Sequence, residues 1–138
     1  MPTIIISEKP DAAEHIAKAL AEKNLKRRKS KYNVDYWEFK RNEKDHIVVS
    51  AVGHLFALKQ KTKGWGCPTL LDSIDWVPSF KFKKSAFSTR YFKTINDVAK
   101  NGSEFIIACD YDNEGSLIGY NILRFICNKK DANRMFFS

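Results

Sequence analysis

Short apolar runs that alternate with helical patterns constrain the fold of this chain more than any other feature of its sequence. Three runs rich in isoleucine and valine have the length of buried strands: Thr3–Ser7, His46–Val52 and Glu104–Cys109. Apolar residues recur at helical intervals in three further segments: Pro10 to about Lys23, Ser88–Asn101 and Ser116–Cys127. Strands that alternate with helices predict an α/β fold, with a central, mainly parallel sheet flanked by helices.

The segment before the second apolar run predicts a β-hairpin inserted into this scheme. Tyr32–Lys40 is rich in aromatic residues, and the connection Arg41–Asp45 joins it to the strand His46–Val52. The basic stretch Lys26–Lys31 in front of the hairpin is expected to be a loop. The stretch Phe56–Phe87 has no clear periodicity, and we expect an irregular excursion with one strand.

The length of 138 residues fits a single domain that spans residues 1–138. Arg134–Phe137 resembles the start of another strand, and the chain stops one residue later, so we expect the N-terminal fragment of a longer protein. No apolar run reaches the ~18–20 residues that span a bilayer. Three widely spaced cysteines indicate neither a disulfide framework nor a zinc site, and reduced thiols indicate the cytoplasm.

The formal net charge of +8 is unevenly distributed. Lys23–Lys44 carries nine Lys or Arg residues against three acids, whereas the acids gather near residues 8–14 and 110–114. Basic segments around an acidic focus favour an anionic polymer, such as a nucleic acid, that is brought to a metal. A charge run taken alone is more typical of a solvated surface.

An acidic motif directly follows the third apolar run and opens the last helix. Asp110, Asp112 and Glu114 occupy alternate positions there, and Glu8 follows the first run. Open parallel sheets bind ligands at the carboxyl ends of their strands. If the first and third strands are parallel neighbours, four carboxylates converge, and a divalent cation relieves their repulsion. Carboxylate oxygens suit Mg²⁺, which can orient a phosphate for phosphoryl transfer, while one carboxylate can act as general acid or base.

Structural roles remain open for each of these acids taken singly. Asp112 or Asn113 could cap the helix, and Asp110 could be a turn residue. The spacing also resembles half of an EF-hand loop, but Asn121 stands at the twelfth position and a strand precedes the motif, which excludes an EF-hand.

Three weaker candidates have two readings each. Lys9 fits a solvated lysine at a helix start or a phosphate contact. His54, after Gly53, fits a structural histidine or a site residue. The aromatic residues of the hairpin could stack bases or face the core: Tyr32, Tyr36, Trp37 and Phe39.

In combination, these motifs resemble the Toprim domain at the N-terminus of type IA DNA topoisomerases. Glu8-Lys9-Pro10 follows the first strand, Gly53-His54-Leu55 follows the second, and the acidic motif follows the third. The helix sequence Ile118–Arg124 is most similar to the archaeal branch, close to bacterial topoisomerase III. The resemblance covers essentially the whole chain and implies a Rossmann-like Toprim fold.

The resemblance also implies a role for each matching residue. Glu8 is expected to be catalytic, as an acid or base near the cleaved bond, and Lys9 to lie near the scissile phosphate. Asp110, Asp112 and Glu114 are expected to bind Mg²⁺. With Lys9, His54 is expected to contact DNA that is single-stranded or underwound.

One departure from the family pattern limits what this chain is expected to do alone. The nucleophile of the family is a tyrosine in a later domain, and no tyrosine of this chain stands in a matching context: Tyr32, Tyr36, Tyr91, Tyr111 and Tyr120. We therefore expect an isomerase only in the full-length parent, with the fragment a monomer that is inactive alone. The alternatives are another Toprim enzyme of the nuclease or primase type, and a non-catalytic nucleic-acid-binding module.

Overall fold

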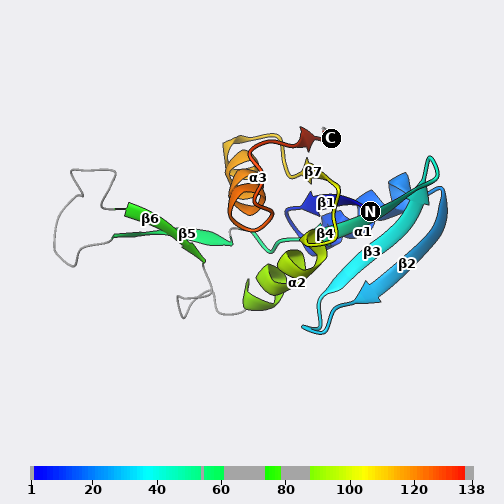
Figure 1. Ribbon diagram of the computed structural model, residues 1–138, viewed down its shortest axis with the longest axis horizontal. Helices are drawn as coiled ribbons and strands as arrows, with labels where there is room; N and C mark the ends of the chain where they lie inside the picture. The colour runs from blue at the N-terminus through cyan, green and yellow to red at the C-terminus, as the bar shows by residue number, and fades with distance from the viewer. Residues whose placement is uncertain (1, 54, 61–73, 79–87, 136–138) are drawn as a thin grey trace.

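A six-stranded mixed sheet is the framework of the computed structural model, which describes residues 2–53, 55–60, 74–78 and 88–135. The strand order is β2-β3-β4-β1-β7-β8 (Figure 1). Their bounds are Thr3–Ser7 (β1), Lys23–Lys29 (β2), Asp35–Arg41 (β3), Lys44–Ser50 (β4), Glu104–Ala108 (β7) and Asn133–Arg134 (β8). The pairs β4–β1, β1–β7 and β7–β8 are parallel, and the pairs β2–β3 and β3–β4 are antiparallel.

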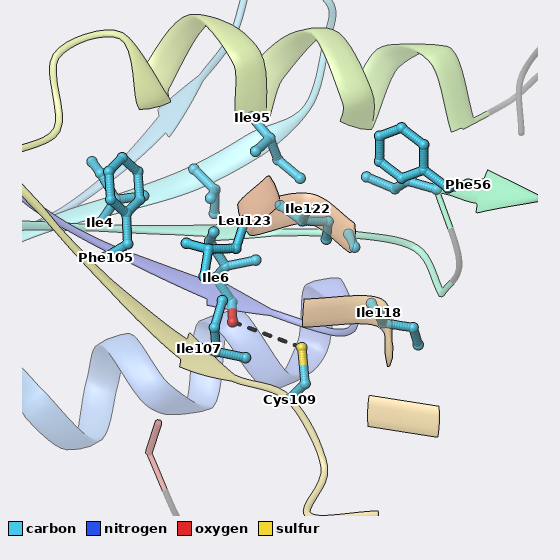
Figure 2. Close-up of a cluster of buried hydrophobic side chains, with 13 residues drawn as sticks. Ile4, Ile6, Phe56, Ile95, Phe105, Ile107, Cys109, Ile118, Ile122 and Leu123 are labelled. Atoms are coloured by element: carbon cyan, nitrogen blue, oxygen red, sulfur yellow. Dashed lines mark hydrogen bonds between the residues drawn. The ribbon is translucent and has the colours of Figure 1, made fainter. Parts of the chain in front are cut away.

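Helices cover both faces of the sheet, as the α/β prediction requires. Helix α1 (Pro10–Leu20) packs on one face, and helices α2 (Thr89–Ala99) and α3 (Asn113–Phe125) pack on the other. Successive residues of β1 point to opposite faces, so Ile5 joins the α1 side while Ile4 and Ile6 join the other cluster (Figure 2). All five residues of β1 are buried, which explains its continuous apolar sequence.

The predicted hairpin is present, but its connection is shorter than expected. Arg41 pairs with Lys44, so β3 and β4 are joined by only two residues, Asn42 and Glu43. Both have left-handed backbone angles, with φ of 52° and 61°. Positive φ at both central residues is the geometry of the tight hairpin turn that matches the twist of the strands.

The predicted loop at Lys26–Lys31 was wrong over most of its length. Lys23–Lys29 forms β2, an edge strand paired antiparallel with β3, and all seven of its residues are exposed. Its stability comes from backbone pairing and from side-chain pairs such as Arg28 with Glu38, and so no apolar pattern marks it. Charged residues are common on edge strands because they discourage pairing with other chains.

The last helix begins three residues earlier than predicted, at Asn113 instead of Ser116. The side chain of Asp112 caps it, with Oδ1 accepting a hydrogen bond from the amide of Gly115 at 2.6 Å. Two of its aromatic residues stay partly exposed, since Tyr120 and Phe125 are 46% and 43% exposed.

The excursion after β4 holds two strands where one was expected. β5 (Phe56–Gln60) and β6 (Ile74–Pro78) form an antiparallel pair of their own. The rest of residues 56–87, and residues 136–138 at the end of the predicted last strand, lie outside the described residues. No described helix is long and apolar enough to cross a membrane.

Candidate functional site

The carboxyl ends of β1 and β7 lie side by side, as the metal-site prediction required. Ser7 of β1 pairs in parallel register with Ala108 of β7. The next residues, Glu8 and Cys109, therefore leave the sheet at the same edge. Glu8 Oε2 accepts a hydrogen bond from the backbone amide of Asp110, with 3.4 Å between the two atoms. Two motifs far apart in the sequence thus share one end of the sheet.

The end of β4 reaches the same place. The amide of Ala51 donates to the carbonyl of Ser7 at 2.9 Å, and the amide of Gly53 donates to the carbonyl of Glu8 at 3.1 Å. Gly53 has φ of +80°, a conformation that favours glycine. His54, the residue that follows, lies outside the described residues, so its predicted contact with DNA stays a prediction.

The acidic loop between β7 and α3 is tightly wound. The amide of Asp112 donates to the carbonyl of Asp110 at 2.9 Å. A Cβ at Gly115 would lie only 2.1 Å from that same carbonyl oxygen, so the loop has no room for a side chain there. The predicted helix-capping role of Asp112 is confirmed, since one oxygen of its carboxylate caps α3.

The predicted site residues differ in their exposure. Asp110, Asp112 and Glu114 are exposed, Glu8 is half-buried, and Lys9 is exposed at the N-cap of α1. The carbonyl of Lys9 is held by the hydroxyl of Ser7, which donates to it at 2.8 Å. The backbone at Lys9 is thus fixed, while its charged side chain is exposed.

The donor chemistry of these residues fits a hard cation, because carboxylate oxygens are the ligands that Mg²⁺ prefers. Their side chains do not converge as closely as predicted. Within the described part of the chain, no three His, Cys, Asp or Glu residues are grouped closely enough to hold a metal ion. The argument for a Mg²⁺ site therefore rests on the carboxylate ligands and on their position at the same end of the sheet.

Arg134 is a site residue that the sequence analysis missed. It ends β8, and its guanidinium donates to the carbonyl of Asp110 at 2.6 Å and to the hydroxyl of Ser116. The same group lies 5.2 Å from the ring centroid of Tyr111. Its position next to the acidic loop follows from the parallel pairing of β7 with β8, which the sequence marked only as the start of a strand.

Cys109 lies directly beneath the acidic loop. Burial, with the nearby carboxylate of Glu8 as the next cause, raises the pKa of this thiol to about 12. Its sulfur faces the carbonyl of Ile6 at 4.0 Å (Figure 2). Cys109 is therefore a neutral thiol at pH 7 and not a thiolate nucleophile.

Two of the aromatic residues in the hairpin face the core, which confirms one of the two interpretations. Trp37 and Phe39 are buried, and both pack in the cluster beneath α1. Tyr36 is half-buried and packs against the cluster on the other face. Base stacking by Trp37 and Phe39 would require them to leave the core.

The sequence profile of the Toprim domain family matches residues 3–138 of this chain. The chain is 42% identical to DNA topoisomerase 1 of Methanocaldococcus jannaschii over 139 residues, which cover 100% of the chain and 18% of the relative. It is 43% identical to DNA topoisomerase 1 of Pyrococcus horikoshii over 138 residues, which cover 98% of the chain and 20% of the relative.

A more distant match is DNA topoisomerase 3 of Staphylococcus epidermidis. It is 31% identical over 148 residues, which cover 100% of the chain and 19% of the relative. The chain thus spans about a fifth of the length of these curated relatives.

Proposed function

The chain belongs to the Toprim domain family, and from that premise we propose that it is the metal-binding domain of a type IA DNA topoisomerase. The observation that carries the proposal is the contact between Glu8 and the amide of Asp110 at the carboxyl edge of the sheet. It supports a single site built from two of the three motifs. In the parent enzyme, this site would serve single-strand cleavage and religation.

Under this proposal, Asp110, Asp112 and Glu114 hold Mg²⁺. When bound, the ion supplies positive charge that neutralises and orients a DNA phosphate. The close approach of Gly115 to the carbonyl of Asp110 holds the acidic loop against the first turn of α3, which carries Glu114. Arg134 positions that loop through its hydrogen bond to the carbonyl of Asp110.

Glu8 and Lys9 act on the DNA side of the site. Glu8 acts as a general acid or base. It donates a proton to the oxygen that leaves the phosphorus, or accepts one from the oxygen that attacks it. Lys9 contributes a point charge to the scissile phosphate. His54 is the third proposed DNA contact. The backbone bond from Gly53 to the carbonyl of Glu8 supports this proposal, because Gly53 directly precedes His54 in the sequence.

The chain works with the remaining domains of its parent, which supply the nucleophilic tyrosine. Its partner is single-stranded or underwound DNA. The chain acts as a monomer, in the cytoplasm. Contacts to the DNA backbone are salt-dependent and largely independent of sequence. The domain alone neither cleaves nor relaxes DNA.

Metal binding is tested with the variant Asp110→Asn/Asp112→Asn. The melting temperature is measured with and without MgCl₂, in the presence of a short single-stranded oligonucleotide. A ligand that binds only the folded state raises stability by about 2.7 kcal/mol at 100 times its Kd. The wild type should gain stability with Mg²⁺, and the variant should not.

The matched control is Asp45→Asn/Glu104→Gln. It removes two exposed acids near the amino-terminal ends of β4 and β7, at the opposite end of the strands from the acidic loop. It should keep the response to Mg²⁺. An unchanged response in Asp110→Asn/Asp112→Asn would overturn the metal site and favour a non-catalytic binding module. Nuclease activity of the chain alone with Mg²⁺ would favour another Toprim enzyme instead.

The catalytic role is tested in the assembled enzyme. Addition of the parent's remaining domains should give Mg²⁺-dependent relaxation of supercoiled DNA. Glu8→Gln should lower that rate by roughly 10²–10⁴-fold, the usual contribution of a general acid or base. A rate close to that of the wild type would remove Glu8 from the chemistry.

A further inference from the structure

A basic surface lies at the far end of α3. A cavity of about 400 Å³ opens there, and five residues line it: Tyr120, Arg124, Asn128, Lys129 and Lys130. We call this surface the α3-end patch. Because α3 has 13 residues, about 20 Å separate it from the acidic loop at the start of the helix (Figure 1). None of its residues belongs to the site described above.

Within the part of the chain that the structure describes, no carboxylate pairs with the cations of the α3-end patch. Among the described residues, Arg124, Lys129 and Lys130 form no ion pair with a carboxylate, and no acid lines the cavity. Asp131 follows Lys130 in the sequence, but it does not line the cavity and its Oδ1 accepts a hydrogen bond from the amide of Ala132. The carbonyl end of a helix carries only about half a negative charge, which cannot balance three cations.

The basic strand β2 behaves differently. Arg27 and Lys29 both pair with Asp35, and Arg28 pairs with Glu38. Three of the five cations of β2 therefore have a carboxylate partner on β3, although two acids offset only part of that charge. The α3-end patch keeps its charge available for a ligand.

An exposed aromatic ring stands beside these cations. Arg124 donates a hydrogen bond to the hydroxyl of Tyr120 at 2.7 Å. The guanidinium also lies 5.9 Å from the ring centroid of Tyr120 and 5.7 Å from that of Phe125. The ring of Tyr120 is thus held in place although its residue is almost half exposed. A fixed aromatic face next to positive charge is the arrangement that stacks a base and holds its phosphates.

We propose that the α3-end patch binds single-stranded nucleic acid, with a base stacked on Tyr120 and phosphates contacted by Arg124, Lys129 and Lys130. The choice of DNA as the natural ligand rests on the proposed function. The chemistry itself rests on the unpaired cations and the exposed ring. A protein segment from the parent is the competing occupant, and the uncompensated charge disfavours an apolar partner of that kind.

Binding is measured by fluorescence anisotropy with labelled oligothymidylate of about 12 nucleotides, within the range of site sizes of single-strand binders. The 138-residue chain is used in EDTA, so that the result does not depend on the metal site. Lys129→Gln/Lys130→Gln should weaken binding roughly tenfold at low salt. It should also reduce the slope of log K against log salt by about 1.4, since each phosphate contact on a single strand contributes about 0.7.

The stacking role needs its own variants, because charge alone would not require an aromatic ring. Tyr120→Leu should weaken binding about tenfold, within the range measured for base–aromatic stacking. Tyr120→Phe keeps the ring and should retain most of the affinity. The matched control, Lys23→Gln/Lys44→Gln, removes two exposed lysines from the β2–β4 side of the sheet and should change affinity by less than about twofold.

Two results would overturn the proposal. One is an affinity for the oligonucleotide that equals that of the wild type in both Lys129→Gln/Lys130→Gln and Tyr120→Leu. That result would favour a protein segment as the occupant of the patch. The other is an equal loss in the control, which would show diffuse electrostatic binding. Either result would leave the Mg²⁺ response of the acidic loop unchanged, so the two proposals fail separately.

Discussion

The carboxylate of Glu8 accepts a hydrogen bond from the backbone amide of Asp110, although 102 residues separate them along the chain. The carbonyl of the same glutamate accepts a bond from Gly53 at 3.1 Å. Glu8 is therefore bonded to the segments that follow both neighbouring strands, β4 and β7. A shift of either strand by one residue would turn its side chains to the other face and separate the motifs.

Asp112 has two roles that substitutions can separate. Asp112→Ala removes the cap of α3 and should lower stability by about 1 kcal/mol in EDTA, because Gly115 loses its acceptor. Asp112→Asn keeps an acceptor oxygen and should stay within a few tenths of a kcal/mol of the wild type. Both variants should lose the Mg²⁺ response. Thermal denaturation of the two, with Glu104→Ala as the exposed-acid control, checks this; equal melting temperatures for both Asp112 variants would contradict it.

Gly115→Ala should disrupt the acidic loop itself. The added Cβ would lie 2.1 Å from the carbonyl oxygen of Asp110, a backbone atom that cannot yield without moving the loop. We expect a loss of about 1–3 kcal/mol in stability and loss of the Mg²⁺ response.

The control for that variant is Gly119→Ala, on the next turn of the same helix. Its Cβ would lie 2.4 Å from Cγ2 of Ile107, which is a side-chain atom in the core. This variant should lose stability but keep the Mg²⁺ response of whatever fraction stays folded. Denaturation curves at several Mg²⁺ concentrations distinguish the two, and a full Mg²⁺ response in Gly115→Ala would refute the prediction.

Glu43→Gly should stabilise the protein. Glu43 adopts φ of 61° in the two-residue turn between β3 and β4, a conformation that strains any residue with a Cβ. Glycine removes that strain, and Asn-Gly is the preferred sequence of this turn. We expect a gain of about 0.5–1 kcal/mol in urea denaturation. Glu43→Ala removes the same charge but keeps the Cβ, so a similar gain in that variant would point to charge and not to backbone strain.

The pairing of Asp35 should make stability depend on acid pH. The hydrogen bond from Arg27 holds the pKa of this carboxyl below its usual value of 3.8, against the opposing effect of burial, with the charges of Arg27 and Lys29 adding to it. A carboxyl whose pKa is lower in the folded state contributes stability above the unfolded pKa and loses it as the pH falls through the folded pKa. The stability difference between wild type and Asp35→Asn should thus be constant near neutral pH and shrink below about pH 4. Urea denaturation across this range measures it.

Arg27→Gln provides the test of the cause. In that background, Asp35→Asn should show a smaller difference in stability, with less dependence on pH, because the principal partner is gone. A pH dependence that survives unchanged would assign the effect to a group other than this pair.

The buried strands and the acidic motif were predictable because their signals are local. Thr3–Ser7 has a continuous apolar centre since both of its faces are covered, and the acids of residues 110–114 stand at the junction of a strand and a helix. The exposed edge strand Lys23–Lys29 was not predictable in this way. It has no buried face, and its hydrogen bonds come from β3.

The sequence by itself determined that short buried strands alternate with helices and that three acids directly follow one of these strands. Those features depend on periodicity and capping within a few neighbouring residues. Only the tertiary structure decided that Glu8 meets Asp110, that Arg134 lies against the acidic loop, and that the cations at the end of α3 stay unpaired among the described residues. These relationships depend on which strands are neighbours and in which register, and sheet pairing sets them between residues that are distant in the chain.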